Sequence, residues 1–458
     1  MNLPHGRPAR SPTVAAFLSF LWPGLGQWYV GAARSALLFA VPVGLVAIAV
    51  GMQMLGGPAR LALALLTPST ALTVVILVGL LGLWRLISMG AAMVAAGRGR
   101  SWRRPIPLAT FGALALTVVV VHAAVGSYAW SFYRAGSEIF VADRGPDISP
   151  LPSASNMPGA PTATPVAEPV NPEARVNFLL TGIDSSETRT QALTDTLLVV
   201  SVDPASGQVA MISFPRDIAR FQLSDGRIFR GKINSLMTYA ERNPEEFPAG
   251  GLPTLVTELG YLLGVPIHYY AAVDLAGFAR MIDRVGGVTV NNQTAIDDPA
   301  YGGWTDGRIG FRLSKGLHTL DGENALAFVR SRKGARDNDF NRARRQQQLL
   351  IALERKLTDP ATIPDLPGIL SDAEDTVRTD FPQDRLADML ELGQSLDDAN
   401  IRGVVLGPPY ARNPPASQSG GTYFLRLDMD RLAALSIEIF GKDSRYWTAE
   451  VPAESVAP

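Results

Sequence analysis

The first 130 residues constrain the fold most, because they combine long apolar stretches with a complete lack of acidic side chains. Residues 36–55, 65–84 and 107–130 are each long enough to cross a bilayer as a helix, which takes about 20 residues. We therefore expect residues 1–130 to form a membrane region with three or four transmembrane helices.

The number of spans depends on residues 14–31, which are apolar but interrupted by a proline and two glycines. This segment is either a fourth span or an interfacial hairpin, and Arg7 and Arg10 favour the hairpin. The span over residues 65–84 is expected to end at Trp84 and Arg85, an aromatic and basic pair typical of a membrane interface.

Arginines orient these spans. The loop "GRGRSWRRP" (97–105) contains four arginines, and Arg34 precedes the first clear span. The positive-inside rule places both in the cytoplasm. The last span therefore leads outward, and the chain after Trp130 is predicted to lie outside the cell membrane of a multi-pass protein.

Residues 131–174 are rich in Pro, Ser and Ala, a composition typical of an extended linker. Alternating strands and helices follow over residues 175–445, and residues 446–458 are expected to be a flexible tail. This alternation predicts an α/β domain with helices covering a mixed sheet. The predicted strands are 176–182, 196–203, 208–214, 267–274, 288–290, 325–332 and 401–407, and the predicted helices are 233–242, 253–264, 275–287, 337–350, 384–396 and 429–441.

Two of these strands, 196–203 and 208–214, are joined by the turn "PASG" and are expected to form a hairpin. The stretch 267–290 reads as a strand–helix–strand unit.

The helix that starts near Asp337 is unusual. Its residues Asp339, Arg342 and Gln346 share one face with Leu350 and Leu353, at about 100° per residue. The polar end of this face needs partners wherever it is buried.

Four arginines lie at the ends of predicted elements, at positions 216, 330, 332 and 342. Arg330 and Arg332 are expected on one face of a strand, where they repel each other unless an anion lies between them. Arginine is well suited to planar, bidentate phosphate recognition. The four side chains together predict a polyanion site.

Two carboxylates lie at the ends of neighbouring strands, Asp184 in "TGIDSS" and Asp195 in "LTDTLL". Carboxylates in this arrangement hold Mg²⁺ when a diphosphate supplies the other oxygens. We therefore expect a Mg²⁺ cofactor at Asp184 and Asp195. Asp297 and Asp298 are expected to be ordinary turn residues.

Several function classes are excluded by what the sequence lacks. It has no cysteine, only four scattered histidines, and none of the motifs GxxxxGK[ST], HExxH or GxSxG. The net charge of −1 gives no basic field for nucleic acid. The residues therefore point to a membrane-anchored, exported domain that binds a polyanion with Mg²⁺.

Seven motifs occur in the order found in the LytR–CpsA–Psr family, and the chain resembles that family densely over 175–360 and loosely over 361–445. They are "FLLTGIDSS", "LTDTLLVVSVDP", "ISFPRD", "KIN", "IDRVGGVTV", "LDGENALAFVRSR" and "DNDFNRARRQQQ". The resemblance implies an α/β/α sandwich with a tunnel for a polyprenyl chain. It also implies a bacterial plasma-membrane enzyme that moves a glycopolymer from polyprenyl diphosphate to peptidoglycan.

The same resemblance implies a role for each site residue. The diphosphate would be bound by Arg216, Arg330, Arg332, Arg342 and Gln346, Asp339 would orient the arginines, Lys232 and Asn234 would line the entrance, and Asp184 and Asp195 would hold Mg²⁺. The general base stays open between Asp195 and Asp217. Leu350 and Leu353 would line or back the lipid tunnel. Many relatives carry Arg where this chain has Leu193, which weakens the expected headgroup binding, and Arg189 is a possible substitute.

Two alternatives to transfer remain at this stage. One is a polyprenyl-diphosphate phosphatase, in which water replaces the sugar acceptor. The other is a lipid-binding sensor or regulator of envelope synthesis that signals through the membrane region.

Overall fold

The structure is a computed structural model that describes residues 10–140, 175–183, 194–335, 337–374, 376–395 and 398–448. Asp184, Arg189, Leu193, most of the predicted linker and the chain from 449 onward lie outside these ranges. The chain divides into two compact units, Met1–Ser137 and Glu138–Pro458.

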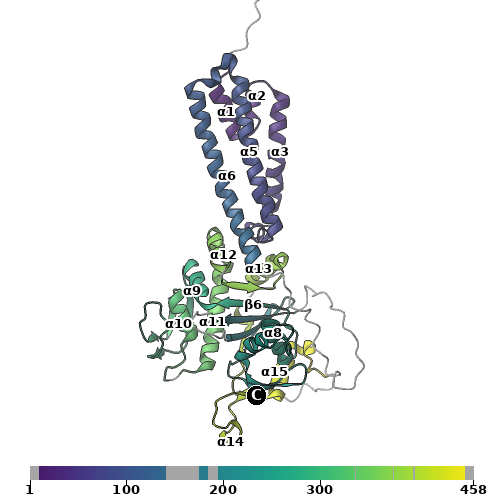
Figure 1. Cartoon of the computed structure of the whole chain (residues 1–458), viewed down its shortest axis with the longest axis vertical. Helices are drawn as coiled ribbons and strands as arrows, with labels where there is room; N and C mark the ends of the chain where they lie inside the picture. The colour runs from purple at the N-terminus through teal and green to yellow at the C-terminus, as the bar shows by residue number, and fades with distance from the viewer. Residues whose placement is uncertain are drawn as a thin grey trace, which may run out of the picture. The chain divides into compact units, whose positions relative to one another are not determined.

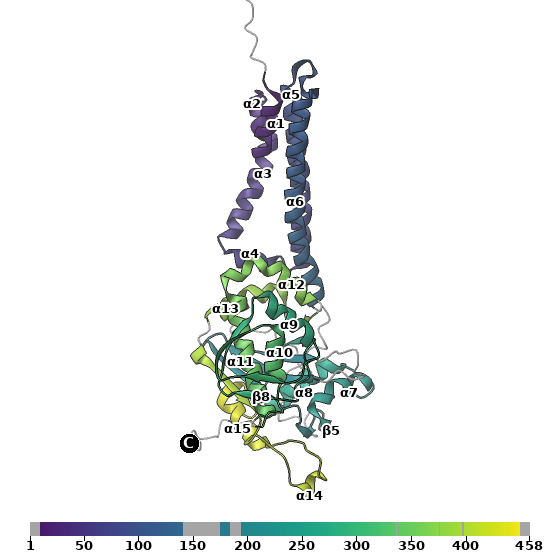
Figure 2. The same cartoon turned by 90° about the vertical axis from the view of Figure 1, so that its left-hand side faces the viewer.

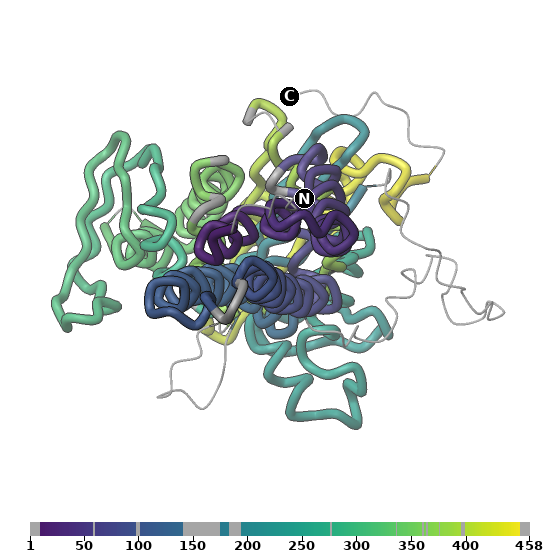
Figure 3. The backbone as a smooth tube through the Cα atoms, turned by 90° about the horizontal axis from the view of Figure 1, so that it is seen from above, coloured from purple at the N-terminus to yellow at the C-terminus, as the bar shows by residue number. Residues whose placement is uncertain are grey.

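Three helices of the first unit are long and apolar enough to cross a membrane, among the residues described: α3 (Ala33–Met54), α5 (Pro68–Ala96) and α6 (Pro105–Ile139). They are the long helices of Figure 2, and Figure 3 shows them nearly end-on. Short helices α1 (Pro12–Leu21), α2 (Leu25–Tyr29), α4 (Pro58–Ala64) and η1 (Arg98–Arg103) complete the unit.

The segment 14–31 forms two short helices, α1 and α2, and not one helix of spanning length. This hairpin packs against α5 through a buried polar cluster. Gln27 donates from Nε2 to the backbone oxygen of Ser88 at 2.8 Å, and the Gly26 amide donates to Ser19 Oγ at 3.2 Å. A side chain at Gly26 would collide with the Ala15 backbone, so the close approach requires glycine.

Two helices of this region extend beyond the predicted segments. Helix α5 continues past Trp84 and Arg85 to Ala96, and the predicted membrane interface at Trp84 and Arg85 stays a prediction. Trp84 packs on Phe39, with ring centroids 5.1 Å apart. Likewise α6 extends to Ile139, so the first nine residues of the predicted linker 131–174 are helical.

The second unit is built on a six-stranded mixed sheet of order β11-β6-β1-β2-β3-β12. β1, β2 and β3 are antiparallel neighbours, which confirms the predicted hairpin, whereas β6 and β12 run parallel to β1 and β3. The strands are β11 (Val377–Thr379), β6 (Tyr269–Asp274), β1 (Val176–Ile183), β2 (Thr194–Asp203), β3 (Gln208–Ser213) and β12 (Ile401–Val405).

Alternate residues of β2 face two separate cores, as the period of a strand requires. Leu197 and Val199 pack in the core formed with α8 (Gly251–Leu263) and α15 (Met429–Phe440) (Figure 1). Leu198 and Val200 pack instead in the core formed with α11 (Asp339–Thr358) and α13 (Leu386–Ser395). Helices thus cover both faces of a mixed sheet, and the predicted α/β/α layering is confirmed.

A third core lies beside α11, where α9 (Leu275–Arg284) and α10 (Gly322–Arg330) pack with β7 (Val288–Asn292) (Figure 2). The strand–helix–strand order β6-α9-β7 is as predicted. However, β7 does not join the main sheet, because it pairs with β10 (Gly316–Leu320) in a separate two-stranded sheet.

The predicted strand 325–332 is wrong, because its residues up to Arg330 belong to helix α10. Asp321 caps this helix by accepting a hydrogen bond from the Asn324 amide at 2.8 Å. All five residues from Ala325 to Val329 are buried, so the burial pattern alone does not distinguish this helix from a strand. Arg330 is the last helical residue and Arg332 lies in the following loop, so the two do not share a strand face.

The remaining elements connect these layers. Helix α8 ends before Gly264, whose φ of 83° is the left-handed conformation that glycine adopts freely. The others are β4 (Ala219–Gln222), β5 (Ile228–Lys232), η2 (Ile233–Ser235), α7 (Leu236–Arg242), β8 (Ile296–Asp298), β9 (Phe311–Leu313), η3 (Pro360–Asp365), α12 (Leu366–Glu374), η4 (Gln383–Arg385), η5 (Asp398–Asn400), β13 (Ala411–Arg412), α14 (Ala416–Ser419), β14 (Arg426–Leu427) and η6 (Gly441–Asp443).

Candidate functional site

The site is organised around the first turns of α11. Asn338 caps this helix, since its side chain accepts a hydrogen bond from the Asn341 amide at 2.9 Å. Asp339, Arg342 and Gln346 then follow at the three- and four-residue spacing that places them on one face. The polar end of this helix face therefore lies in the first turns of α11.

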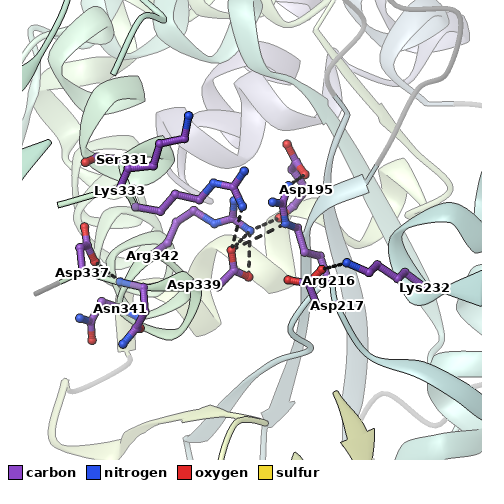
Figure 4. Close-up of polar contacts among 12 residues, drawn as sticks. Asp195, Arg216, Asp217, Lys232, Ser331, Lys333, Asp337, Asp339, Asn341 and Arg342 are labelled. Atoms are coloured by element: carbon purple, nitrogen blue, oxygen red, sulfur yellow. Dashed lines mark hydrogen bonds and ion pairs between the residues drawn. The ribbon is translucent and has the colours of Figure 1, made fainter. Parts of the chain in front are cut away.

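Asp339 is surrounded by guanidinium groups (Figure 4). Its Oδ1 lies 2.9 Å from Arg342 Nη2, and 3.7 Å from both Arg216 Nε and Arg332 Nη1. Arg216 also donates from Nη1 to Asp195 Oδ1 at 2.7 Å. One helix, one loop and two strand ends thus bring together five of the predicted site residues.

Burial and neighbouring charges shift the pKa values in this cluster. Burial raises the pKa of Asp339, against the opposing pull of Arg342 and Arg216. Burial lowers the pKa of Arg342, which is 5% exposed. Burial also acts to lower the pKa of Arg216, but the Asp195 carboxylate outweighs it and the pKa is raised. Burial therefore outweighs the neighbouring charges at Asp339 and Arg342, and the carboxylates outweigh burial only at Arg216.

A polar cavity of about 360 Å³ opens beside the cluster. Five arginine or lysine side chains and two aspartates line it, so that cations remain in excess even when Asp339 is added. The lining consists of Asp195, Thr196, Arg216, Asp298, Ala300, Tyr301, Gly302, Gly303, Val329, Arg330, Arg332, Lys333, Arg342 and Gln346. This composition suits an anion with several oxygens.

The other predicted site residues lie elsewhere. Asp217 and Lys232 form an ion pair with each other and do not line the cavity (Figure 4). Asn234 is buried, and its backbone oxygen accepts a hydrogen bond from Thr194 Oγ1 at 3.2 Å. The structure therefore does not bring Lys232 and Asn234 to the cavity wall. Asp184 lies outside the described residues.

Several buried polar atoms at this cavity lack a well-aligned hydrogen-bond partner within the described part of the chain. They are Arg216 Nε, Tyr301 Oη and Arg342 Nε. An unsatisfied buried polar group costs roughly 1–3 kcal/mol, so such groups are rare and call for a ligand or water. Their concentration here supports a polar ligand in the cavity.

An apolar cavity of about 180 Å³ adjoins the polar one. The two share Thr196, Val329 and Gln346 in their walls. Leu350 and Leu353 line the apolar cavity, together with Leu180, Thr181, Gly182, Leu198, Val273, Phe278, Met281, Leu349 and Val377. The shared face of α11 thus changes from charged side chains at its start to aliphatic side chains further along. This arrangement suits a ligand with a charged head and an apolar chain.

Several residues that line the polar cavity were not predicted as site residues, among them Lys333, Asp298 and Tyr301. Asp298, expected to be a turn residue, is 2% exposed and accepts hydrogen bonds from Ser331 Oγ and the amides of Arg332 and Lys333 at 2.9–3.0 Å. It thereby fixes the loop that carries Arg332. Tyr301 is 7% exposed and its hydroxyl is among the unpartnered atoms. No local sequence signal marks the role of Asp298, because its partners in the loop lie 33 to 35 positions away.

Carboxylates suitable for Mg²⁺ are present but few. No group of three or more His, Asp or Glu side chains that could hold a metal ion occurs among the described residues. Asp195 lines the polar cavity and is the carboxylate there that fits a metal bound mainly by ligand phosphate oxygens.

The fold and site define a class: an α/β domain with an arginine-rich anion cavity joined to an apolar one, in a chain whose described residues include three helices long and apolar enough to cross a membrane. Comparison with known proteins agrees, since the LytR_cpsA_psr family matches residues 154–436. This match covers more than half of the sequence, and the chain belongs to the LytR_cpsA_psr family.

Curated relatives are named transferases. The polyisoprenyl-teichoic acid–peptidoglycan teichoic acid transferase TagU of Bacillus anthracis is 30% identical over 224 residues, which cover 49% of this chain and 66% of the relative. The TagU of Halalkalibacterium halodurans is 29% identical over 220 residues, which cover 48% and 65%. The chain thus spans just under two thirds of the length of these relatives.

Solved structures are also similar. TagV of B. subtilis matches at 25% identity with a TM-score of 0.46, over 58% of this chain and 97% of TagV. TagU of B. subtilis matches at 23% identity with a TM-score of 0.43, over 61% of this chain and all of TagU.

Proposed function

We propose that this protein is a membrane-anchored phosphotransferase that moves a glycopolymer from a polyprenyl diphosphate carrier onto peptidoglycan. The observation that carries the proposal is the junction of the two cavities at Gln346 and Val329, with guanidinium groups on one side and aliphatic side chains on the other. The names of the curated relatives support the same reaction class.

The donor headgroup would occupy the polar cavity. Arg216, Arg330, Arg332 and Arg342 would neutralise the diphosphate, and planar guanidinium groups can each bind two of its oxygens. The polyprenyl chain would enter the apolar cavity beside Leu350 and Leu353. Asp339 would hold the arginines together around the headgroup, since it lies within 3.7 Å of three of them.

In the reaction, an acceptor sugar hydroxyl would attack the phosphorus that carries the donor glycan. A new oxygen–phosphorus bond forms, the bond to the bridging oxygen breaks, and polyprenyl monophosphate leaves with that electron pair. The arginines stabilise the charge that develops on the phosphoryl oxygens. Asp195 would accept the hydroxyl proton, because it lines the cavity and Asp217 does not; both carboxylates are paired with a cation, Asp195 with Arg216 and Asp217 with Lys232.

Mg²⁺ is part of the proposal. Asp195 would contribute to its binding together with Asp184, and the diphosphate would provide further oxygens. The ion would supply additional neutralisation of phosphate charge when bound.

The reaction site would lie outside the cytoplasm. Three long apolar helices support a membrane anchor, and the arginines at 34 and 97–105 favour an outward-facing domain under the positive-inside rule. Lipid-linked donor and peptidoglycan acceptor would then meet on the same side of the bacterial plasma membrane.

The decisive experiment uses the full-length chain in detergent, with a polyprenyl diphosphate oligosaccharide, Mg²⁺ and peptidoglycan fragments. Polyprenyl monophosphate and glycan attached to peptidoglycan are measured together, for the wild type, Arg332→Ala and Asp195→Ala. Arg355→Ala, an exposed residue near the other end of α11, is the matched control. We expect Mg²⁺-dependent attachment that both site variants lose by at least about 100-fold.

Other outcomes would redirect the assignment. Monophosphate released at the same rate without peptidoglycan, with no glycan attached, would make the protein a phosphatase. Tight lipid binding with neither product would make it a sensor.

A further inference from the structure

A second cavity, of about 430 Å³ and lined by both apolar and polar groups, lies on another face of α11. We call it the amide groove. It is formed between the first half of α11 and residues 292–297, and its lining includes Gln293, Thr294, Asp297, Asn341, Arg344 and Gln348. None of its lining residues belongs to the polar cavity of the site.

Residues adjacent in the sequence line the amide groove and the site cavity. Asp297 lines the groove, and Asp298 lines the site cavity. On α11, Asn341 lines the groove and Arg342 lines the site cavity (Figure 4). A β-carbon added to Gly334 would lie 2.6 Å from the Asp297 backbone oxygen, so the loop after α10 packs directly on β8. A ligand long enough to cross the start of α11 could occupy both cavities.

The charged side chains of the amide groove are largely neutralised by ion pairs. Arg345 pairs with Asp337 at 2.9 Å, and both side chains are at most 10% exposed. Asp297 pairs with Arg312 at 2.9 Å. The groove therefore lacks the cation excess of the site cavity and offers little to a phosphate.

The remaining lining of the groove mixes apolar surface with uncharged polar groups, and its apolar part includes Ala295 and Ile296. Gln293 and Gln348 each donate from Nε2 to the backbone oxygen of Asn291, so their amide oxygens and second amide hydrogens remain for a ligand. Arg344 is exposed and donates to Asn341 Oδ1 at 2.8 Å. Sugar hydroxyl and acetamido groups also donate and accept, so amide side chains match them. The groove volume lies within the roughly 300–1,000 Å³ typical of ligand pockets.

We propose that the amide groove binds a run of hydroxyl- and acetamido-bearing sugars next to the reacting headgroup. The proposal rests on the proposed transferase function. Acceptor and donor glycans share this chemistry. The site cavity and the apolar cavity already account for the diphosphate and the chain of the donor, whereas the acceptor has no place in either one.

The first test is direct binding, which does not depend on turnover. The full-length protein in detergent is titrated with an N-acetylglucosamine oligosaccharide, using calorimetry and saturation-transfer NMR. We expect the double variant Gln293→Ala/Gln348→Ala to bind about ten-fold more weakly than the wild type, since it loses two amide contacts. Arg355→Ala, on the same helix but outside the groove, should bind within two-fold of the wild type.

Polyprenyl diphosphate binding is measured on the same variants and should stay within two-fold, because neither glutamine lines the site or the apolar cavity. Equal oligosaccharide affinity in the double variant and the wild type would overturn the proposal. Undetectable binding by the wild type at millimolar oligosaccharide would overturn it as well.

Steady-state transfer separates the two glycan sources. A raised KM for the acceptor with an unchanged KM for the donor assigns the groove to the acceptor. A raised KM for a long-glycan donor, but not for a single-sugar donor, assigns it to the donor glycan. If neither KM moves, the groove is not a glycan subsite. If the wild type transfers nothing, the proposed function fails, and the binding titration alone decides the fate of the groove.

Discussion

Asp339 and Arg342 lie one helical turn apart at the start of α11, with Asp339 Oδ1 2.9 Å from Arg342 Nη2. Their side chains are 18% and 7% exposed, so the pair is largely removed from water. Arg216 and Arg332 approach the same carboxylate to 3.7 Å. One buried carboxylate thus holds three guanidinium groups together, and positive charge remains for an anionic ligand.

Asp339→Asn should destabilise the ligand-free protein, because it leaves the guanidinium groups facing one another without the central carboxylate. Breaking a buried ion pair typically costs about 3–5 kcal/mol. We expect a fall in Tm of at least about 6 °C, measured by thermal unfolding in detergent. Pyrophosphate should restore more of the Tm in the variant than in the wild type, because it replaces the lost negative charge.

The control for this change is Asp225→Asn, which removes one partner of an exposed ion pair with Arg227. Exposed pairs contribute only about 0–1 kcal/mol, so the Tm should hardly move. Equal Tm values for Asp339→Asn and the wild type would show that the carboxylate does not hold the arginines.

Thr181→Val should stabilise the protein. Thr181 is 2% exposed, its hydroxyl has no hydrogen-bond partner in the described structure, and it lines the apolar cavity. Removing an unsatisfied buried hydroxyl relieves roughly 1–3 kcal/mol. The same substitution at Thr194, whose hydroxyl donates to the Asn234 backbone oxygen, should destabilise by a similar amount. Chemical denaturation curves of the two variants that shift in the same direction would contradict this assignment.

Much of the fold was predictable because its signals are local. The antiparallel hairpin of β2 and β3, the end of α8 at Gly264 and the polar-to-apolar face of α11 all follow from turns, caps and periodicity. Residues 325–330 were mistaken for a strand, because a short apolar run has no decisive period. The Asp321 cap at the start of α10 was the signal that could have corrected it.

The site was predictable only in part. The cluster of Arg216, Arg342 and Asp195 could be expected from residue type and from position at element ends. In contrast, the contact of Asp298 with Ser331 joins residues 33 positions apart and depends on how β8 packs on the loop after α10. No local pattern encodes such a contact, and the amide groove on the neighbouring face of α11 could not be predicted for the same reason.

His268 should make stability depend on pH. Burial, assisted by the nearby Arg385 charge, lowers the pKa of His268 from 6.5 to about 4. Its Nδ1 accepts a hydrogen bond from the Asn177 amide at 2.9 Å, which requires an unprotonated nitrogen. Between these two pKa values the unfolded state binds a proton that the folded state does not. Stability is therefore fully present above about pH 6.5 and is lost as the pH falls towards 4.

The expected loss from this single group is about 2 kcal/mol between pH 7 and pH 5. It is measured by denaturant unfolding at both pH values, for the wild type and for His268→Gln, which cannot titrate in this range. Carboxylates contribute equally to both proteins, so the wild type should lose about 2 kcal/mol more than the variant. Parallel pH profiles would show that His268 protonates as readily folded as unfolded.

Asp298→Asn should weaken headgroup binding, although the substitution changes no arginine side chain. Asp298 Oδ2 accepts hydrogen bonds from Ser331 Oγ and two backbone amides, and an amide nitrogen in its place would face three donors. We expect a loss of roughly 1–3 kcal/mol of stability and about ten-fold lower affinity for polyprenyl diphosphate, because the loop carrying Arg332 is released. The neighbouring Asp297→Asn is the matched control, since its carboxylate is 64% exposed and pairs with an exposed Arg312. Changes of equal size in the two variants, measured by lipid titration and thermal unfolding, would mean that Asp298 does not position the loop.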